Sequence, residues 1–143
     1  YFCPVITMAK DKFHDNVREA LLKEGWTITH DPFPLEDWRP GWEIDLGAER
    51  LIAAERGAEK IAVEVKGFHE QSFAYEFHRA LGQYLNYKSG LKRLESTRTV
   101  FLAVPIEIYY REFAQIGVRA SLEDYEVKIL VFDPLTNDII TWI

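Results

Sequence analysis

Two largely apolar segments, residues 99–104 and 127–132, constrain the fold of this chain more than any other feature. Neither alternates apolar with polar residues, as a strand does when one of its faces meets water. Such segments indicate strands that are covered on both faces. A sheet with two covered faces needs helices on each side, so we expect an α/β sandwich around a mixed central β-sheet.

The rest of the chain supplies helices and further strands in an order that suits this sandwich. Its 143 residues, 48% of them hydrophobic, are enough for one domain with a packed core. The prolines at positions 32, 34 and 40 predict a loop over 31–41. The expected elements are a helix over 11–24 ended by Gly25, strands over 26–29, 43–46, 51–55 and 60–66, a helix over 72–94, a strand over 99–104, a helix over 107–125 broken near Gly117, and strands over 127–132 and 139–143.

Charge and composition exclude several classes of protein. The net charge of -6 argues against an obvious nucleic-acid binder, because phosphate contacts require Lys and Arg. Contact with DNA would therefore need a local basic patch, a partner or a metal ion. The single Cys3 excludes an internal disulfide and a cysteine metal cluster.

The ends of the chain and its hydropathy predict where the protein resides. No apolar run approaches the roughly 20 residues that span a bilayer. Residues 1–7 lack the basic start of a signal peptide, and Met8 resembles a natural beginning. We therefore expect residues 1–7 to be an extension that is not native, residues 8–143 to form the domain, and the protein to be cytoplasmic and not bound to membranes.

The segment 60–66 carries the candidate reaction centre. Because side chains alternate across a strand, Ile61, Val63 and Val65 share one face, while Glu64 and Lys66 share the other, roughly 7 Å apart. If the strand that holds Asp45 lies close by, Asp45 and Glu64 can bind one hard cation such as Mg²⁺ between them. Such an ion lowers the pKa of a bound water, and Lys66 can orient that water or neutralise charge on a phosphate.

These residues resemble a known nuclease motif. Asp45 followed by Glu64-Val65-Lys66 is similar to the D…E-x-K core of the PD-(D/E)XK superfamily, although Ile44 stands where that motif often has proline. Gln83 and Tyr87, four residues apart, are similar to its auxiliary Q-x-x-x-Y element. The resemblance implies a restriction-endonuclease-like sandwich in which Asp45, Glu64 and Lys66 are catalytic, Asp45 and Glu64 bind Mg²⁺ or Mn²⁺, and Gln83 and Tyr87 assist.

A second resemblance extends over nearly all of the chain after Met8. The segments that carry it are FHD (13–15), GWTIT (25–29), IDLGAE (44–49), LIAAERG (51–57), KIAVEVK (60–66), LGQYLNY (81–87) and VFD (131–133). They resemble the XisH family of controlling factors, which assist a site-specific recombinase in excising a chromosomal DNA element. The resemblance implies an XisI-type factor as partner. It is compatible with a Mg-dependent endonuclease or with a catalytically silent regulatory or scaffolding subunit.

Each candidate residue also has a simpler interpretation. Glu-x-Lys by itself is more often a solvated salt pair on an edge strand. His14 is a candidate for metal or phosphate binding, or for a local hydrogen bond. Glu19 is a candidate extra metal ligand, or an exposed helix charge. Exposed aromatics such as Trp38 and Trp42 would stack on bases, cover the sheet end, or bury against a partner or a second copy in a homo-oligomer.

Overall fold

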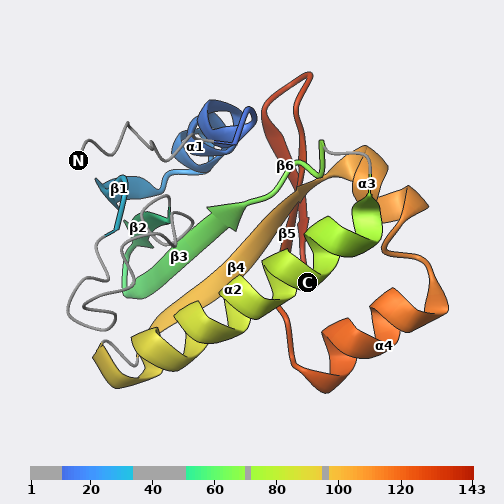
Figure 1. Ribbon diagram of the computed structural model, residues 1–143. Helices are drawn as coiled ribbons and strands as arrows, with labels where there is room; N and C mark the ends of the chain where they lie inside the picture. Colours follow the sequence, from blue (N-terminus) through green and yellow to red (C-terminus); the bar gives the residue numbers. More distant parts are fainter. Residues whose placement is uncertain (1–10, 34–50, 70–71, 95–96) are drawn as a thin grey trace, which may run out of the picture.

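The computed structural model describes residues 11–33, 51–69, 72–94 and 97–143 (Figure 1). The predicted strand over 43–46, with Asp45, and residues 1–7, Trp38 and Trp42 lie outside these ranges. The elements are α1 (His14–Lys23), β1 (Thr27–His30), β2 (Ile52–Arg56), β3 (Glu59–Val65), α2 (Phe73–Leu94), β4 (Arg98–Pro105), α3 (Ile106–Arg111), α4 (Ile116–Asp124), β5 (Ile129–Asp133) and β6 (Asp138–Trp142).

The described strands form one six-stranded sheet in the order β1-β2-β3-β4-β5-β6. Strand β2 runs antiparallel to both of its neighbours, β1 and β3, and β6 returns antiparallel to β5. The pairs β3–β4 and β4–β5 are parallel, because helices connect them. The predicted mixed sheet of an α/β fold is therefore confirmed, with antiparallel pairs in the majority.

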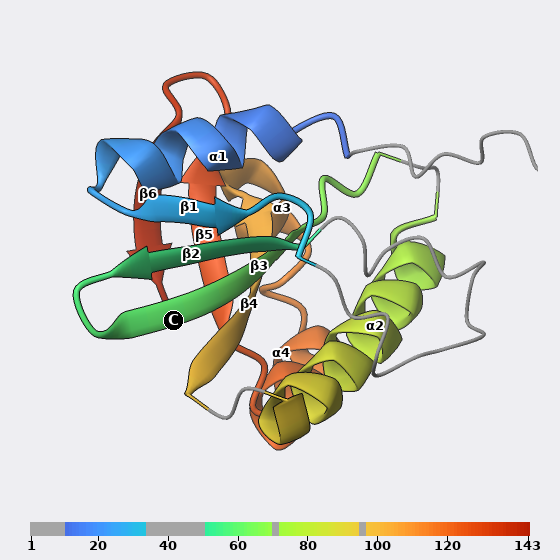
Figure 2. The same ribbon diagram turned by 90° about the vertical axis from the view of Figure 1, so that its left-hand side faces the viewer.

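Helices cover both faces of this sheet, as the apolar segments predicted. Figure 2 shows α1 on one face, with α2 and α4 on the other. Along β3, Ile61, Val63 and Val65 belong to the core under α1, whereas Ala62 belongs to the core under α2. The central strands β4 and β5 contribute side chains to both cores. The face that holds Ala62 and α2 is called the α2 face below.

Local hydrogen bonds explain where α1 begins and ends. The Asp11 carboxylate accepts a hydrogen bond from the Phe13 N–H at 2.9 Å, which satisfies a backbone donor at the helix start. Gly25 adopts φ +86° and ends the helix, as predicted, because a side chain strains that backbone conformation. The Trp26 N–H then donates to the Leu21 carbonyl at 3.1 Å.

The predicted helix over 107–125 is in two pieces, as expected. The break lies at residues 112–115, between α3 and α4, a few positions before Gly117, which lies in the first turn of α4. Phe113, 1% exposed, anchors this turn in the core under α2. The break therefore coincides with the burial of an aromatic ring, and Gly117 has no left-handed backbone conformation there. In the described residues no helix is long and apolar enough to cross a membrane.

Candidate functional site

Glu64 occupies a position that rules out the simpler interpretation of the Glu-x-Lys motif. It lies on β3, which has neighbours on both sides, and is only 2% exposed. Both of its carboxylate oxygens are excluded from solvent. The motif is therefore no solvated salt pair on an edge strand. Burial of a carboxylate costs several kcal/mol before its interactions are counted, so packing alone does not account for a glutamate here.

The backbone on either side of Lys66 is tied to two other elements. The Lys66 N–H donates to the Ala103 carbonyl at 3.0 Å, which extends the parallel pairing of β3 with β4. The Gly67 N–H donates to Asp11 Oδ2 at 2.8 Å. Asp11 Oδ1 also lies 3.2 Å from His69 Nε2. Asp11 therefore joins the start of α1 to the residues that follow the motif, a contact over 56 positions that sequence reasoning missed.

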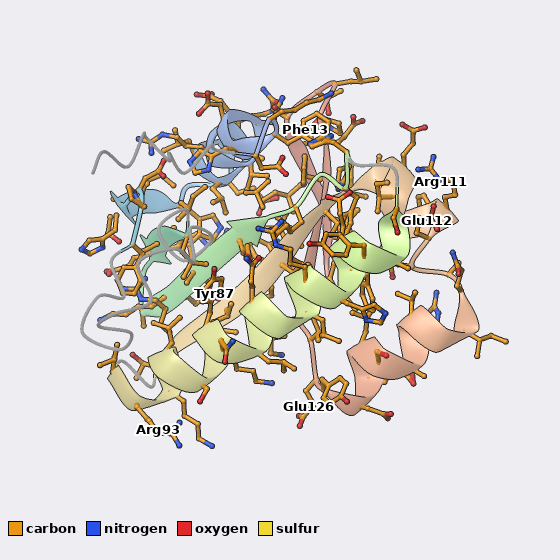
Figure 3. All side chains as sticks on the ribbon, in the orientation of Figure 1. Phe13, Tyr87, Arg93, Arg111, Glu112 and Glu126 are labelled. Atoms are coloured by element: carbon orange, nitrogen blue, oxygen red, sulfur yellow. The ribbon has the colours of Figure 1, made fainter. Side chains whose placement is uncertain are left out.

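Helix α2 presents Gln83 and Tyr87 toward the sheet. Tyr87 is fully buried, and Figure 3 shows its ring between α2 and the sheet. Gln83 Oε1 is excluded from solvent and has no hydrogen-bond partner among the described residues. Glu64 alternates with Val63 and Val65 and so points to the α2 face. The fold thus brings Glu64, Gln83 and Tyr87 to the same side of the sheet.

The other two candidates lie on the opposite side, on α1. His14 is 1% exposed, and its Nε2 lies 2.8 Å from Asp31 Oδ1. Arg18 Nη1 donates to Asp31 Oδ2 at 2.6 Å, so the carboxylate joins both side chains. Glu19 is exposed on the outer side of the helix. The sheet separates both residues from Glu64, which favours the local hydrogen bond for His14 and the exposed charge for Glu19.

Comparison with known proteins identifies the family. The model of the XisH family, described as XisH protein, matches residues 7–140. The chain belongs to the XisH family. One similar structure is an XisH family protein from Nostoc punctiforme PCC 73102, 43% identical, with a TM-score of 0.80, covering 93% of this chain and 99% of that chain.

A second similar structure adds a functional description of another protein. It is an fdxN element excision controlling factor protein from Anabaena variabilis, 42% identical, with a TM-score of 0.80. The match covers 92% of this chain and 97% of that chain. Comparison with curated proteins gives no match.

Tyr84 fixes the rotation of α2 in this XisH chain. Its hydroxyl donates to the Val100 carbonyl at 3.0 Å and accepts from the Lys128 N–H at 3.0 Å. Burial raises the pKa of Tyr84 above the ordinary 10.0, a shift that the Lys128 hydrogen bond opposes. The two bonds lock α2 against the sheet, with Gln83 one position before and Tyr87 three positions after.

A buried arginine closes one end of the α2 face of the XisH sheet. Arg98 is 6% exposed, and its Nη1 donates to the Ile61 carbonyl at 2.9 Å. Its Nη2 lies 3.4 Å from Glu55 Oε2, and its guanidinium lies 5.0 Å from the centre of the Phe33 ring. Sequence reasoning missed this residue, although a lone cation at the start of an apolar segment is a signal for a buried, paired charge.

The oxygen atoms near Glu64 are of a type that suits a hard divalent cation. The Glu64 carboxylate and the Gln83 amide oxygen on the α2 face, and the backbone carbonyl of Val65 at the end of β3, are oxygen ligands of the type that Mg²⁺ prefers. Within the described ranges no three His, Cys, Asp or Glu side chains are grouped to hold a metal ion. A site for such an ion at Glu64 would need a second carboxylate, and the predicted candidate, Asp45, lies outside those ranges.

Proposed function

We propose that this XisH family member acts in the excision of a chromosomal DNA element, as a Mg²⁺-dependent endonuclease of the PD-(D/E)XK type with a restriction-endonuclease-like sandwich. The observation that carries the proposal is the burial of Glu64 on a central strand, on the side that α2 covers with Gln83 and Tyr87. The excision factor from Anabaena variabilis, 42% identical, supports the biological setting.

The proposed chemistry is hydrolysis of a phosphodiester. A bound Mg²⁺ would supply a water of lowered pKa and stabilise charge on the phosphate. Asp45 and Glu64 would hold the ion, with Mn²⁺ as a substitute, and Gln83 would contribute an amide oxygen. Lys66 orients the attacking water and neutralises negative charge that develops on the phosphate. The water oxygen bonds to phosphorus and gives up a proton to solvent, one P–O ester bond breaks, and the leaving oxygen takes up a proton.

One observation favours a second candidate function. Both Glu64 oxygens are excluded from solvent, so a phosphodiester reaches them only if α2 or its surroundings move. A catalytically silent subunit needs no such movement. In this second proposal the nuclease fold serves as a regulatory or scaffolding component that binds an XisI-type partner or a second copy, in a site-specific recombinase system on DNA.

Calorimetric titration of Mg²⁺ and Mn²⁺ tests the first proposal, together with nicking of supercoiled plasmid by the same samples. The proteins are the wild type, Glu64→Ala and the control Glu59→Gln, which removes an exposed carboxylate from the same strand. We expect metal binding and nicking by the wild type and the control, and neither by Glu64→Ala. Wild-type metal affinity in Glu64→Ala would refute the ligand role.

Excision in cells that carry Lys66→Ala separates the two proposals. An enzyme loses excision when Lys66 is lost, whereas a silent subunit retains it. Solution mass, measured with and without an XisI-type protein, tests the assembly. A mass that stays that of a monomer, both alone and with the XisI-type protein, would exclude the scaffolding role.

A further inference from the structure

The outer side of α2 carries a line of polar side chains with one glycine among them, in which Arg93 Nη1 donates to Ser89 Oγ at 3.0 Å. Tyr75, Arg79, Gly82, Asn86, Ser89 and Arg93 follow one another at intervals of four and three residues, which places them along one side of the helix. Ser89 is partly buried and the other five are exposed. Figure 3 shows Arg93 pointing away from the sheet, whereas Tyr87 points toward it. These six residues are called the α2 stripe.

The charge of α2 opposes that of the whole chain. The helix holds Arg79, Lys88, Lys92 and Arg93 against one carboxylate, Glu76, so four positive charges minus one negative give +3. The whole chain carries -6, and subtracting +3 leaves -9 on the remaining residues. No Asp or Glu occurs between Glu76 and the end of the helix. Helix α2 is therefore a local basic region on an acidic protein.

Gly82, at the middle of the stripe, has no packing role within the described structure. A Cβ built on it meets no atom of the described residues within 4 Å, so an alanine would fit. Glycine weakens a helix interior, because it loses more backbone freedom on folding than any other residue. A glycine at an exposed, unobstructed position is explained if an external molecule approaches the helix backbone there.

The arginines of the stripe are far enough apart to contact two separate phosphates. Arg79 and Arg93 are 14 positions apart, or about 21 Å along the helix axis. A DNA duplex carries one phosphate per roughly 1.7 Å of its axis, so each arginine can reach a phosphate when the helix lies against the duplex. Arg, Ser, Asn and Tyr are residues that commonly contact phosphate oxygens. Between Tyr75 and Arg93 the stripe has no large apolar residue, which argues against a coiled-coil partner.

We propose that the α2 stripe binds the phosphodiester backbone of a DNA duplex, with Gly82 as the point of close approach. The proposal rests on the DNA-directed function proposed above and names the surface that such a function would use. The stripe lies on the side of α2 that faces away from the sheet, whereas Glu64 lies on the sheet side; Gln83 is its nearest site residue, next to Arg79 and Asn86 on the helix.

Fluorescence anisotropy of a labelled 25-base-pair duplex of arbitrary sequence, titrated with the full chain at several salt concentrations, tests the proposal. The variant Arg79→Gln/Arg93→Gln removes two phosphate contacts. Each contact contributes about 0.9 to the slope of log affinity against log salt, so the slope should fall by roughly 1.8 and affinity by roughly 60-fold at about 0.1 M salt. Gly82→Leu should weaken binding by at least roughly tenfold while the protein stays folded.

The control Lys12→Gln/Arg111→Gln removes two exposed charges away from the stripe and should retain most of the affinity. An unchanged slope in the stripe variant, or no binding of the duplex by the wild type, would overturn the proposal. An RNA duplex of the same sequence shows whether the sugar matters, and a preference for RNA would also overturn it. The Glu64→Ala variant should bind the duplex as tightly as the wild type. A loss of nicking with unchanged duplex binding would then count against the metal site and not against the α2 stripe.

Discussion

The two hydrogen bonds of the Tyr84 hydroxyl allow a quantitative test of how α2 is fixed. Tyr84→Phe removes a donor to the Val100 carbonyl and an acceptor for the Lys128 N–H. Each bond contributes about 1 kcal/mol, and a backbone group left unsatisfied in the interior adds a further penalty. We expect the free energy of unfolding to fall by about 2–3 kcal/mol. The melting temperature should fall by roughly 6–12 °C for a domain of this size.

The same variant should change the alkaline dependence of stability. The pKa of Tyr84 is raised in the folded protein, so the native state holds the hydroxyl proton more tightly than the unfolded chain does. This contribution to stability is fully present below the unfolded pKa of 10.0 and is lost as pH rises through the higher folded pKa. Above pH 10 the wild type should therefore lose stability more steeply than Tyr84→Phe.

Urea denaturation followed by circular dichroism, at pH 7 and at steps above pH 10, measures both effects. Tyr110→Phe is the matched control, because Tyr110 is 67% exposed and should change stability by less than about 0.5 kcal/mol. A Tyr84→Phe protein as stable as the control at pH 7 would show that these bonds do not hold α2. Parallel alkaline curves for Tyr84→Phe and wild type would refute the linkage argument.

Three further predictions follow from named contacts. Arg98→Met should lower the free energy of unfolding by about 3 kcal/mol in urea denaturation, because a buried guanidinium and its bonds to the sheet are lost. Gly82→Ala should raise it by about 1 kcal/mol, since the site is open and helical, and an unchanged melting temperature would contradict this. The hydrogen bond from Lys23 holds the pKa of Asp138 below 3.8, so its contribution to stability is present above pH 3.8 and lost as pH falls. Carboxyl NMR titration of Lys23→Met should show that pKa raised toward its usual value, with the Thr136 hydrogen bond still lowering it, whereas an unchanged pKa would assign the shift to other groups.

Local sequence signals located the helices and strands of this fold well. The period of 3.6 marked α1 and α2, and the alternation along 60–66 placed Glu64 opposite Val63 and Val65. These signals succeed because each depends on neighbours within one element. The break between α3 and α4 lies a few residues ahead of Gly117, where Phe113 reaches a core that the whole fold builds.

The sequence by itself determined the family, the mixed α/β class and which residues share a face of a strand or helix. Only the tertiary structure decided that Glu64 is enclosed, that Asp31 lies beside His14, and that Asp11 bonds Gly67. The physical reason is that burial and pairing depend on residues distant in sequence, whereas periodicity depends on near ones. The sequence of a strand does not show whether water or a helix covers a carboxylate on it. In this protein α2 covers the side of the sheet that holds Glu64.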